Sequence, residues 1–141
     1  MDEEDVDALL ASTGWGILSL AADDEPYSIP ISFGYDGTAV YFGFLRTDGG
    51  NRKSEFVADG RTARLLVTDV RARFDWQSVA VTGPLQAVDW QGDDWETLVD
   101  RLDENAWFAS GFADADAVEG IRGWRLDAET VHGVEVRPGQ R

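Results

Sequence analysis

The chain has 141 residues, of which 43% are apolar, and its 27 Asp and Glu against 12 Lys and Arg give a formal net charge of −15. This length suits a single domain over residues 1–141, and the absence of cysteine excludes disulfides and thiolate chemistry. The charge disfavours nucleic acid and anionic membranes as partners, because both repel it. The start at Met1 is acidic, and no apolar run could cross a bilayer, so we expect a soluble, cytoplasmic protein.

The acidity goes together with a near absence of lysine, since Lys53 is the only one. This bias is typical of a halophilic protein, because concentrated salt shortens the Debye length to about 3 Å at 1 M and screens repulsion on the surface. An ordinary protein that uses negative charge for solubility is the alternative. Residues 46–73 depart from the bias, with seven basic residues against four acidic ones. A basic segment in such a chain indicates an anionic ligand, although arginines that pair with the acidic surface would also explain it.

In the first half of the chain, apolar residues at helical spacing, Val6, Leu9 and Leu10, predict a short leading helix. Alternating segments at 15–21 and 27–33 predict two strands around a turn, and Pro30 indicates an edge or a bulge in the second. A third strand is expected at 39–44, and we expect the three to form a meander. Residues 51–58 then predict a short helix with Asn51 as its N-cap.

In the second half, strands are expected at 64–68 and 77–85, separated by a basic link at 69–74. Asp93, with Glu96 three residues later, predicts a helix, and a shorter one is expected near 113–118. Closing strands are expected at 124–126 and 131–136. The pattern predicts a mainly β domain of about six short antiparallel strands with a few short helices, closed wholly or partly into a barrel.

The strongest local signal for chemistry is Asn51-Arg52-Lys53 at the start of the predicted helix, directly after Gly49-Gly50. Free backbone N–H groups, the positive end of the helix dipole and two cations would converge there, which suits a phosphate group. A solvated helix start with paired surface cations is the alternative reading.

Weaker signals lie on the predicted strands. Gln77 and Ser78 open an otherwise apolar strand and could hydrogen-bond a ligand, but such residues often face water at a strand end. Ser28 and Ser32 could present a polar face to a planar ring, or form the wet side of a half-exposed strand. We interpret His132 as a structural histidine. The same interpretation, core rather than cofactor site, applies to the tryptophans Trp15, Trp76, Trp95 and Trp124.

In order and spacing, five segments resemble the FMN-binding split barrels related to pyridoxamine-phosphate oxidase. They are Gly16-Ile-Leu-Ser-Leu, Pro26-Tyr-Ser-Ile-Pro-Ile-Ser-Phe33, Val40-Tyr-Phe-Gly-Phe44, Asn51-Arg-Lys53 and Trp76-Gln-Ser-Val-Ala-Val-Thr-Gly83. The resemblance covers roughly residues 10–90. It implies a mainly β, six-stranded antiparallel split β-barrel that forms a homodimer with FMN near the subunit interface.

Carried over by position, the resemblance assigns residues to three parts of an FMN site. The flavin ring would lie beside Pro30, Ile31, Ser32 and Phe33, and near Phe42, Gly43 and Phe44. Arg52 and Lys53 would hold the phosphate with Asn51 adjacent, and Ser78 and Gln77 would complete the site. The charge argument points to the same Arg52 and Lys53.

The sequence also departs from the family. Pyridoxamine-phosphate oxidases carry a downstream Arg-Pro-Arg-x-Ser-like segment that grips the substrate phosphate, whereas residues 86–120 here are acidic and hold Arg101 as their only cation. Oxidation of vitamin B6 is therefore not expected, and the chain resembles small relatives such as flavin reductase-like and nitroimidazole-reductase-like proteins. We expect an FMN-dependent oxidoreductase with a small-molecule substrate or electron donor. A module that binds or senses flavin without turnover is the main alternative. A barrel that holds a deazaflavin or haem is another, and haem is disfavoured by the single histidine.

Overall fold

The computed structural model describes residues 1–45, 57–88, 96–98, 100 and 121–139. Within them lie one helix, α1 (Glu3–Thr13), and eight strands. The strands are β1 (Trp15–Ala22), β2 (Glu25–Ser32), β3 (Gly34–Tyr35), β4 (Ala39–Leu45), β5 (Thr62–Ala72), β6 (Asp75–Val88), β7 (Ile121–Asp127) and β8 (Thr130–Val136). The mainly β class is confirmed, with two strands more than the expected six. Residues 96–98 and 100 are helical and lie within the helix expected from Asp93, whereas residues 113–118 are outside the described part.

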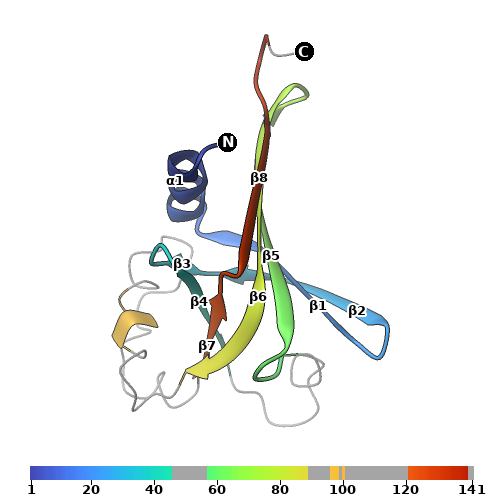
Figure 1. Cartoon of the computed structure of the whole chain (residues 1–141), viewed down its shortest axis with the longest axis vertical. Coiled ribbons are helices and arrows are strands. Elements are labelled where there is room, and N and C mark those ends of the chain that lie inside the picture. The colour runs from blue at the N-terminus through green and yellow to red at the C-terminus, as the bar shows by residue number, and fades with distance from the viewer. Residues whose placement is uncertain (46–56, 89–95, 99, 101–120, 140–141) are drawn as a thin grey trace.

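Helix α1 begins with a reciprocal capping box and ends at a glycine. The Asp2 side chain accepts a hydrogen bond from the Asp5 backbone N–H, and the Asp5 side chain accepts one from that of Asp2. Gly14 then takes the left-handed conformation that ends many helices, with φ 76°. The predicted apolar stripe of Val6, Leu9 and Leu10 is buried, so the helix covers one face of the sheet (Figure 1).

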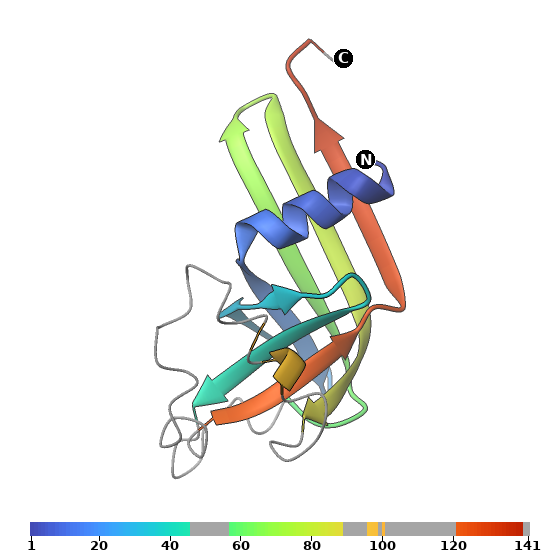
Figure 2. The ribbon, with the colours of Figure 1, turned by 90° about the vertical axis from the view of Figure 1, so that its left-hand side faces the viewer.

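All eight strands pair antiparallel in the order β2-β1-β5-β6-β7-β4-β3, with β8 also paired to β6. Strand β6 belongs to two halves of the sheet, because its first part pairs with β5 and β8 and its last part pairs with β7. Figure 2 shows the two halves crossing, with α1 lying across the long strands. The sheet does not close, as expected for a split barrel.

Gly83 marks the point where β6 changes partner. Thr82 is the last β6 residue paired with β8, and Leu85 is the first paired with β7. A Cβ atom at position 83 would overlap the carbonyl oxygen of Asp127, at the corner between β7 and β8. Only glycine leaves room for this close approach of two backbones, so the residue permits the bend that separates the halves of the sheet.

Two details of the predicted topology are wrong. The first three long strands do not form a meander, because β4 pairs with β3 and β7 and not with β2. Pairing with β7, some 80 residues further along, buries the apolar side of β4 on the β7 half of the sheet. The basic link predicted at 69–74 is largely strand, since β5 continues to Ala72 and the turn contains only Arg73 and Phe74. Charged residues alternate with exposed apolar ones such as Val70 and Phe74 here, because the strands extend beyond the core.

The core lies between α1 and the two halves of the sheet. Its largest fully buried side chains include Phe33, Phe42, Leu18 and Leu65. Trp124 is buried as predicted, whereas Trp15 is 41% exposed, which corrects its assignment to the core; Trp76 is half-buried and Trp95 lies outside the described residues. Within the described part of the chain, no helix combines the length and apolarity required to cross a membrane.

Candidate functional site

The residues predicted to line a flavin ring separate into two sets by the side of the sheet they face. The side chains of Ile31, Phe33 and Phe42 are buried in the core. Pro30 is exposed and Ser32 is half-buried, on the opposite side of β2. A ligand at the end of β2 would therefore contact the side chains of Pro30 and Ser32, and only the backbone of Ile31 and Phe33. Gly43 is half-buried on β4, and the side chain of Phe44 lies outside the described set.

Pro30 and Ser32 belong to a continuous surface of the long-strand half of the sheet. Cross-strand pairing places Trp15 opposite Ser32, Ile17 opposite Pro30, and Leu66 on the far side of Ile17. We call the side of β1, β2, β5, β6 and β8 that points away from α1 and the core the outer face. Its members are Trp15, Ile17, Ser19, Ala21, Pro26, Ser28, Pro30, Ser32, Thr62, Arg64, Leu66, Thr68, Val70, Trp76, Ser78, Ala80, Thr82, Thr130, His132, Val134 and Val136.

Gln77 and Ser78 point to opposite sides of β6, so they cannot serve one ligand on one face. Ser78 pairs with Thr68 and Val134 on the outer face, whereas Gln77 pairs with Asp69 and Glu135 on the other side. Ser32 and Ser78 share the outer face but lie three strand spacings apart, about 14 Å. Gln77 and Ser78 were assigned to one site because they are neighbours in the sequence, but successive residues of a strand point to opposite sides of the sheet.

The Gln77 side of this strand end carries a charged groove that the sequence did not reveal. It encloses about 370 Å³ and is lined by residues of β5, β6 and β8 and the following turn. Arg71 pairs with Asp69 at 3.3 Å, and Arg137 pairs with Glu135 at 2.9 Å. Alternation along each strand shows which residues share a side of that strand. Finding the groove also requires the register between β5, β6 and β8, and β8 is far from the other two strands in the sequence.

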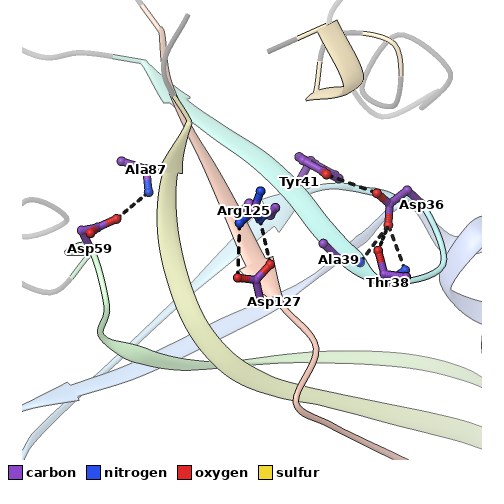
Figure 3. A network of polar contacts seen from close by, with 8 residues as sticks. All are labelled: Asp36, Thr38, Ala39, Tyr41, Asp59, Ala87, Arg125 and Asp127. Carbon is purple, nitrogen blue, oxygen red and sulfur yellow. Dashed lines mark hydrogen bonds and ion pairs between the residues drawn. The ribbon is translucent and has the colours of Figure 1, made fainter. Parts of the chain in front are cut away.

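The predicted phosphate residues Asn51, Arg52 and Lys53 lie outside the described residues, and so does most of the helix predicted there. Val57 and Ala58, its last two residues, are not helical, which corrects the end of that helix. Val57 is buried. The chain that follows is fixed to β6, because the Asp59 carboxylate accepts a hydrogen bond from the Ala87 N–H at 2.8 Å (Figure 3). The Gly60 N–H also donates to the Leu85 carbonyl at 2.7 Å.

Asp36 organises the turn that leads into β4. Its carboxylate accepts hydrogen bonds from the backbone N–H groups of Thr38 at 2.9 Å and Ala39 at 2.8 Å, and from the hydroxyls of Thr38 at 3.0 Å and Tyr41 at 3.2 Å (Figure 3). Partial burial alone would raise its pKa, but these donors outweigh burial and lower it. The turn therefore holds the start of the strand that carries Phe42 and Gly43.

Tyr35 and Arg125 complete the polar contacts around β4. The Tyr35 hydroxyl donates to the Gly37 carbonyl at 2.9 Å and to Asp7 of α1 at 3.3 Å. Burial, followed by the charge and hydrogen bond of Asp7, raises the pKa of Tyr35 to about 12. Arg125 on β7 pairs with Asp127 at 2.7 Å (Figure 3). The Tyr35 hydroxyl therefore links β3 to α1, whereas the Arg125–Asp127 pair lies within β7.

The fold and the sequence can be compared with those of known proteins. A family model described as pyridoxamine 5′-phosphate oxidase matches residues 2–135. The chain belongs to this family. Among curated proteins, an uncharacterized protein of Rhizobium meliloti (strain 1021) is 24% identical over 86 residues, which is 61% of this chain. The match spans 54% of that relative, about half of its length.

Solved structures share this fold over nearly the whole chain. The FAD binding protein from Mycobacterium smegmatis has a TM-score of 0.73 at 19% identity, covering 99% of this chain and 98% of its own. A FAD-binding protein from Mesorhizobium loti has a TM-score of 0.71 at 19% identity, with 96% of each chain covered. The FAD and heme binding protein from M. smegmatis has a TM-score of 0.71 at 18% identity, covering 98% of this chain and 72% of its own.

Proposed function

We propose that this protein binds FMN and acts as a flavin-dependent oxidoreductase. The observation that carries the proposal is the surface beside β2, where Pro30 and Ser32 lie next to Trp15 and Ile17 and none of the described outer-face side chains is a carboxylate. An apolar surface with hydroxyl groups and without negative charge fits a planar ring that carries an anionic phosphate. Membership of the pyridoxamine 5′-phosphate oxidase family supports the same ligand class.

The phosphate of FMN would be held by Arg52 and Lys53, with Asn51 adjacent. The support is the basic segment 46–73, which keeps an excess of positive charge in a chain of net charge −15. Charge-assisted hydrogen bonds contribute about 1.5–3 kcal/mol each, so a few of them would hold a phosphate in competition with salt. Asn51, Arg52 and Lys53 lie in the sequence between the end of β4 at Leu45 and Val57, which is buried.

The site is proposed to need a second copy of the chain. Gln77 points to the side of β6 opposite Ser78 and Ser32, so one chain cannot present all three side chains to one flavin. A homodimer in which the groove around Gln77 meets the β2 end of the second copy would bring Gln77 close to the β2 residues that are proposed to lie beside the ring. We propose that the protein is cytoplasmic. Because the chain is strongly acidic, we propose no nucleic-acid or membrane partner.

When bound, the flavin supplies the redox chemistry, and the protein supplies binding, orientation and polarity around it. The substrate and the electron donor would be small molecules. Residues 86–120 hold a single cation, Arg101, so no second phosphate-gripping cluster supports vitamin B6 as the substrate. The chain's contribution is therefore a sheet surface that shields one side of the ring and a basic segment that anchors the phosphate.

The test is a visible absorbance spectrum of protein reconstituted with FMN, freed of unbound flavin and compared with an Arg52→Ala/Lys53→Ala variant. A matched control is Arg61→Ala/Arg73→Ala, which removes the same charge from the same basic segment and leaves the groove around Gln77 intact. We expect wild type and control to retain flavin and the Arg52/Lys53 variant to lose it. If both variants retain FMN equally, the assignment of Arg52 and Lys53 to the phosphate is refuted. If the protein retains FAD but not FMN, the cofactor is FAD instead of FMN.

A second measurement tests turnover. The flavin-loaded protein is mixed anaerobically with NADH or NADPH, and bleaching of the flavin band is followed. Reduction by either donor supports an oxidoreductase. If a tightly bound flavin is reduced by no donor, the protein is a module that binds or senses flavin and is not an oxidoreductase. If a deazaflavin is retained in place of FMN, the deazaflavin is the cofactor.

A further inference from the structure

The charged groove around Gln77 lies where β5, β6 and β8 extend beyond the rest of the sheet (Figure 2). Polar side chains line it in two rows that cross the three strands. The first row is Asp69, Gln77 and Glu135, which lie directly opposite one another. The second row, nearer the turn between β5 and β6, contains Arg71, Asp75 and Arg137.

A β-bulge adds Arg71 to the second row. The register of β5 on β6 shifts between Val70 and Ala72, so Arg71 is an extra residue of β5. Bulges redirect side chains, and here the Arg71 Nε donates to the Asp69 carboxylate at 3.3 Å. Among the described residues this is the only side-chain hydrogen bond of Arg71. Its two terminal nitrogens therefore remain available to a ligand in the groove.

One carboxylate of the groove has no counter-charge. Arg71 pairs with Asp69, and Arg137 pairs with Glu135 at 2.9 Å. Asp75 is half-buried, yet its side chain makes no hydrogen bond or ion pair with any residue that the structure describes. The groove thus presents an acceptor for a positive group beside guanidinium donors for a negative one.

This arrangement selects a ligand that carries both charges. A simple anion such as phosphate would face three carboxylates, and a metal ion would face two guanidinium groups. A small zwitterion can place its ammonium on Asp75 and its carboxylate on the terminal nitrogens of Arg71, and both existing ion pairs stay intact. Arg137 is the less available donor, because it contacts Asp5 at 3.8 Å as well as Glu135.

The spacing of the two charges limits the size of the zwitterion. Arg71 and Asp75 belong to neighbouring strands, which lie about 4.8 Å apart. The charged groups of a dipeptide are attached to Cα atoms about 3.8 Å apart, so they lie about 5–6 Å from each other. A groove of about 370 Å³ can hold such a molecule. We propose that the groove binds a small zwitterion of dipeptide size, with Asp75 on the ammonium and Arg71 on the carboxylate.

This site goes beyond the proposed function, because it belongs to one chain and needs neither flavin nor a second copy. In the two-copy arrangement proposed above, the zwitterion would lie between this groove and β2 of the second copy. Its binding is measured without flavin. A failure to bind the zwitterion is therefore distinct from a failure to bind FMN.

The experiment is a titration of flavin-free, isotope-labelled full-length protein, followed by the backbone amide signals in NMR spectra. Circular dichroism verifies that each protein is folded. The probe is glycylglycine. Two further probes share its peptide unit and nearly its size: N-acetylglycine lacks the ammonium, and glycylglycinamide lacks the carboxylate.

Each variant has a matched control that removes the same charge outside the groove. Arg71→Gln is compared with Arg73→Gln, on the same hairpin, whose guanidinium lies over the Phe74 ring 5.4 Å from its centre and does not line the groove. Asp75→Asn is compared with Asp24→Asn, an exposed carboxylate in the turn between β1 and β2.

We expect glycylglycine to shift amide signals of β5, β6 and β8 around the groove and to bind more tightly than either singly charged probe. Asp75→Asn and Arg71→Gln should each weaken glycylglycine about tenfold, the lower end for a charge-assisted contact, because the groove is open to solvent. Asp75→Asn should leave N-acetylglycine unaffected, and Arg71→Gln should leave glycylglycinamide unaffected. The two control variants should bind glycylglycine as wild type does.

No binding of glycylglycine, or equal affinity of folded wild type for the three probes, would overturn the proposal. Variants in the groove that bind glycylglycine as tightly as their controls would overturn the roles of Asp75 and Arg71. If a variant does not fold, the comparison of the three probes on wild type decides the question, because each probe removes one charge from the ligand and leaves the protein unchanged.

Discussion

Replacing Asp36 by alanine tests how the turn before β4 is held. The substitution removes an acceptor that takes four hydrogen bonds, two of them from the backbone N–H groups of Thr38 and Ala39 at 2.9 and 2.8 Å. Ala39 is buried, so its N–H has little access to water once the carboxylate is gone. An unsatisfied buried donor costs about 1–3 kcal/mol, whereas hydroxyls near the surface can turn to water.

The expected loss for Asp36→Ala is therefore about 2 kcal/mol in the free energy of unfolding. For a domain of this size that is a fall in Tm of about 6–8 °C. Asp36→Asn keeps one acceptor oxygen for the two backbone donors but loses the charge, so it should cost about 1 kcal/mol. Glu129→Gln, an exposed carboxylate on the corner between β7 and β8, is the control and should stay within about 0.5 kcal/mol of wild type.

The assay is urea unfolding followed by tryptophan fluorescence at pH 7 and at steps down to pH 3. Asp36 has a folded pKa below its ordinary value of 3.8, because the donors outweigh the opposing effect of burial. Its stabilisation is therefore complete above about pH 5 and is lost as the pH falls through 3.8 toward the folded pKa. The difference between wild type and Asp36→Asn should shrink below pH 4. An Asp36→Ala variant as stable as the Glu129→Gln control at pH 7 would refute the reasoning.

Two further predictions concern the frame around the site. Gly83→Ala should lower the free energy of unfolding by about 3 kcal/mol, because the new Cβ would overlap the Asp127 carbonyl. The control Gly37→Ala, at an open position with φ 100°, should cost only about 1 kcal/mol. Equal urea midpoints for the two variants would contradict a close approach at Gly83. The pKa of Tyr35 is raised to about 12 from 10.0, so its contribution to stability is complete below pH 10 and is lost as the pH rises from 10 to 12. The urea midpoint of Tyr35→Phe should therefore change less between pH 9 and 11.5 than that of wild type. Identical pH profiles for the two proteins would count against this role of Tyr35.

Local patterns in the sequence were enough to identify the elements and the kind of fold. The spacing of Val6, Leu9 and Leu10 predicted α1, and alternation predicted most of the strands, because both signals arise from neighbours in the chain. Pro30 predicted an edge position, and β2 is at one end of the sheet. The excess of acidic residues and the basic segment 46–73 are likewise properties of the sequence alone.

The tertiary structure decided which of these elements meet. The pairing of β4 with β7 joins segments far apart in the chain, and no local pattern encodes that register. The register also showed that Gln77 and Ser78 serve opposite sides, and that Trp15 is exposed although its residue type favours the core. The outer face is the clearest case: its residues come from five strands between positions 15 and 136, so its lack of carboxylates becomes visible only when cross-strand pairing brings alternate residues onto one surface.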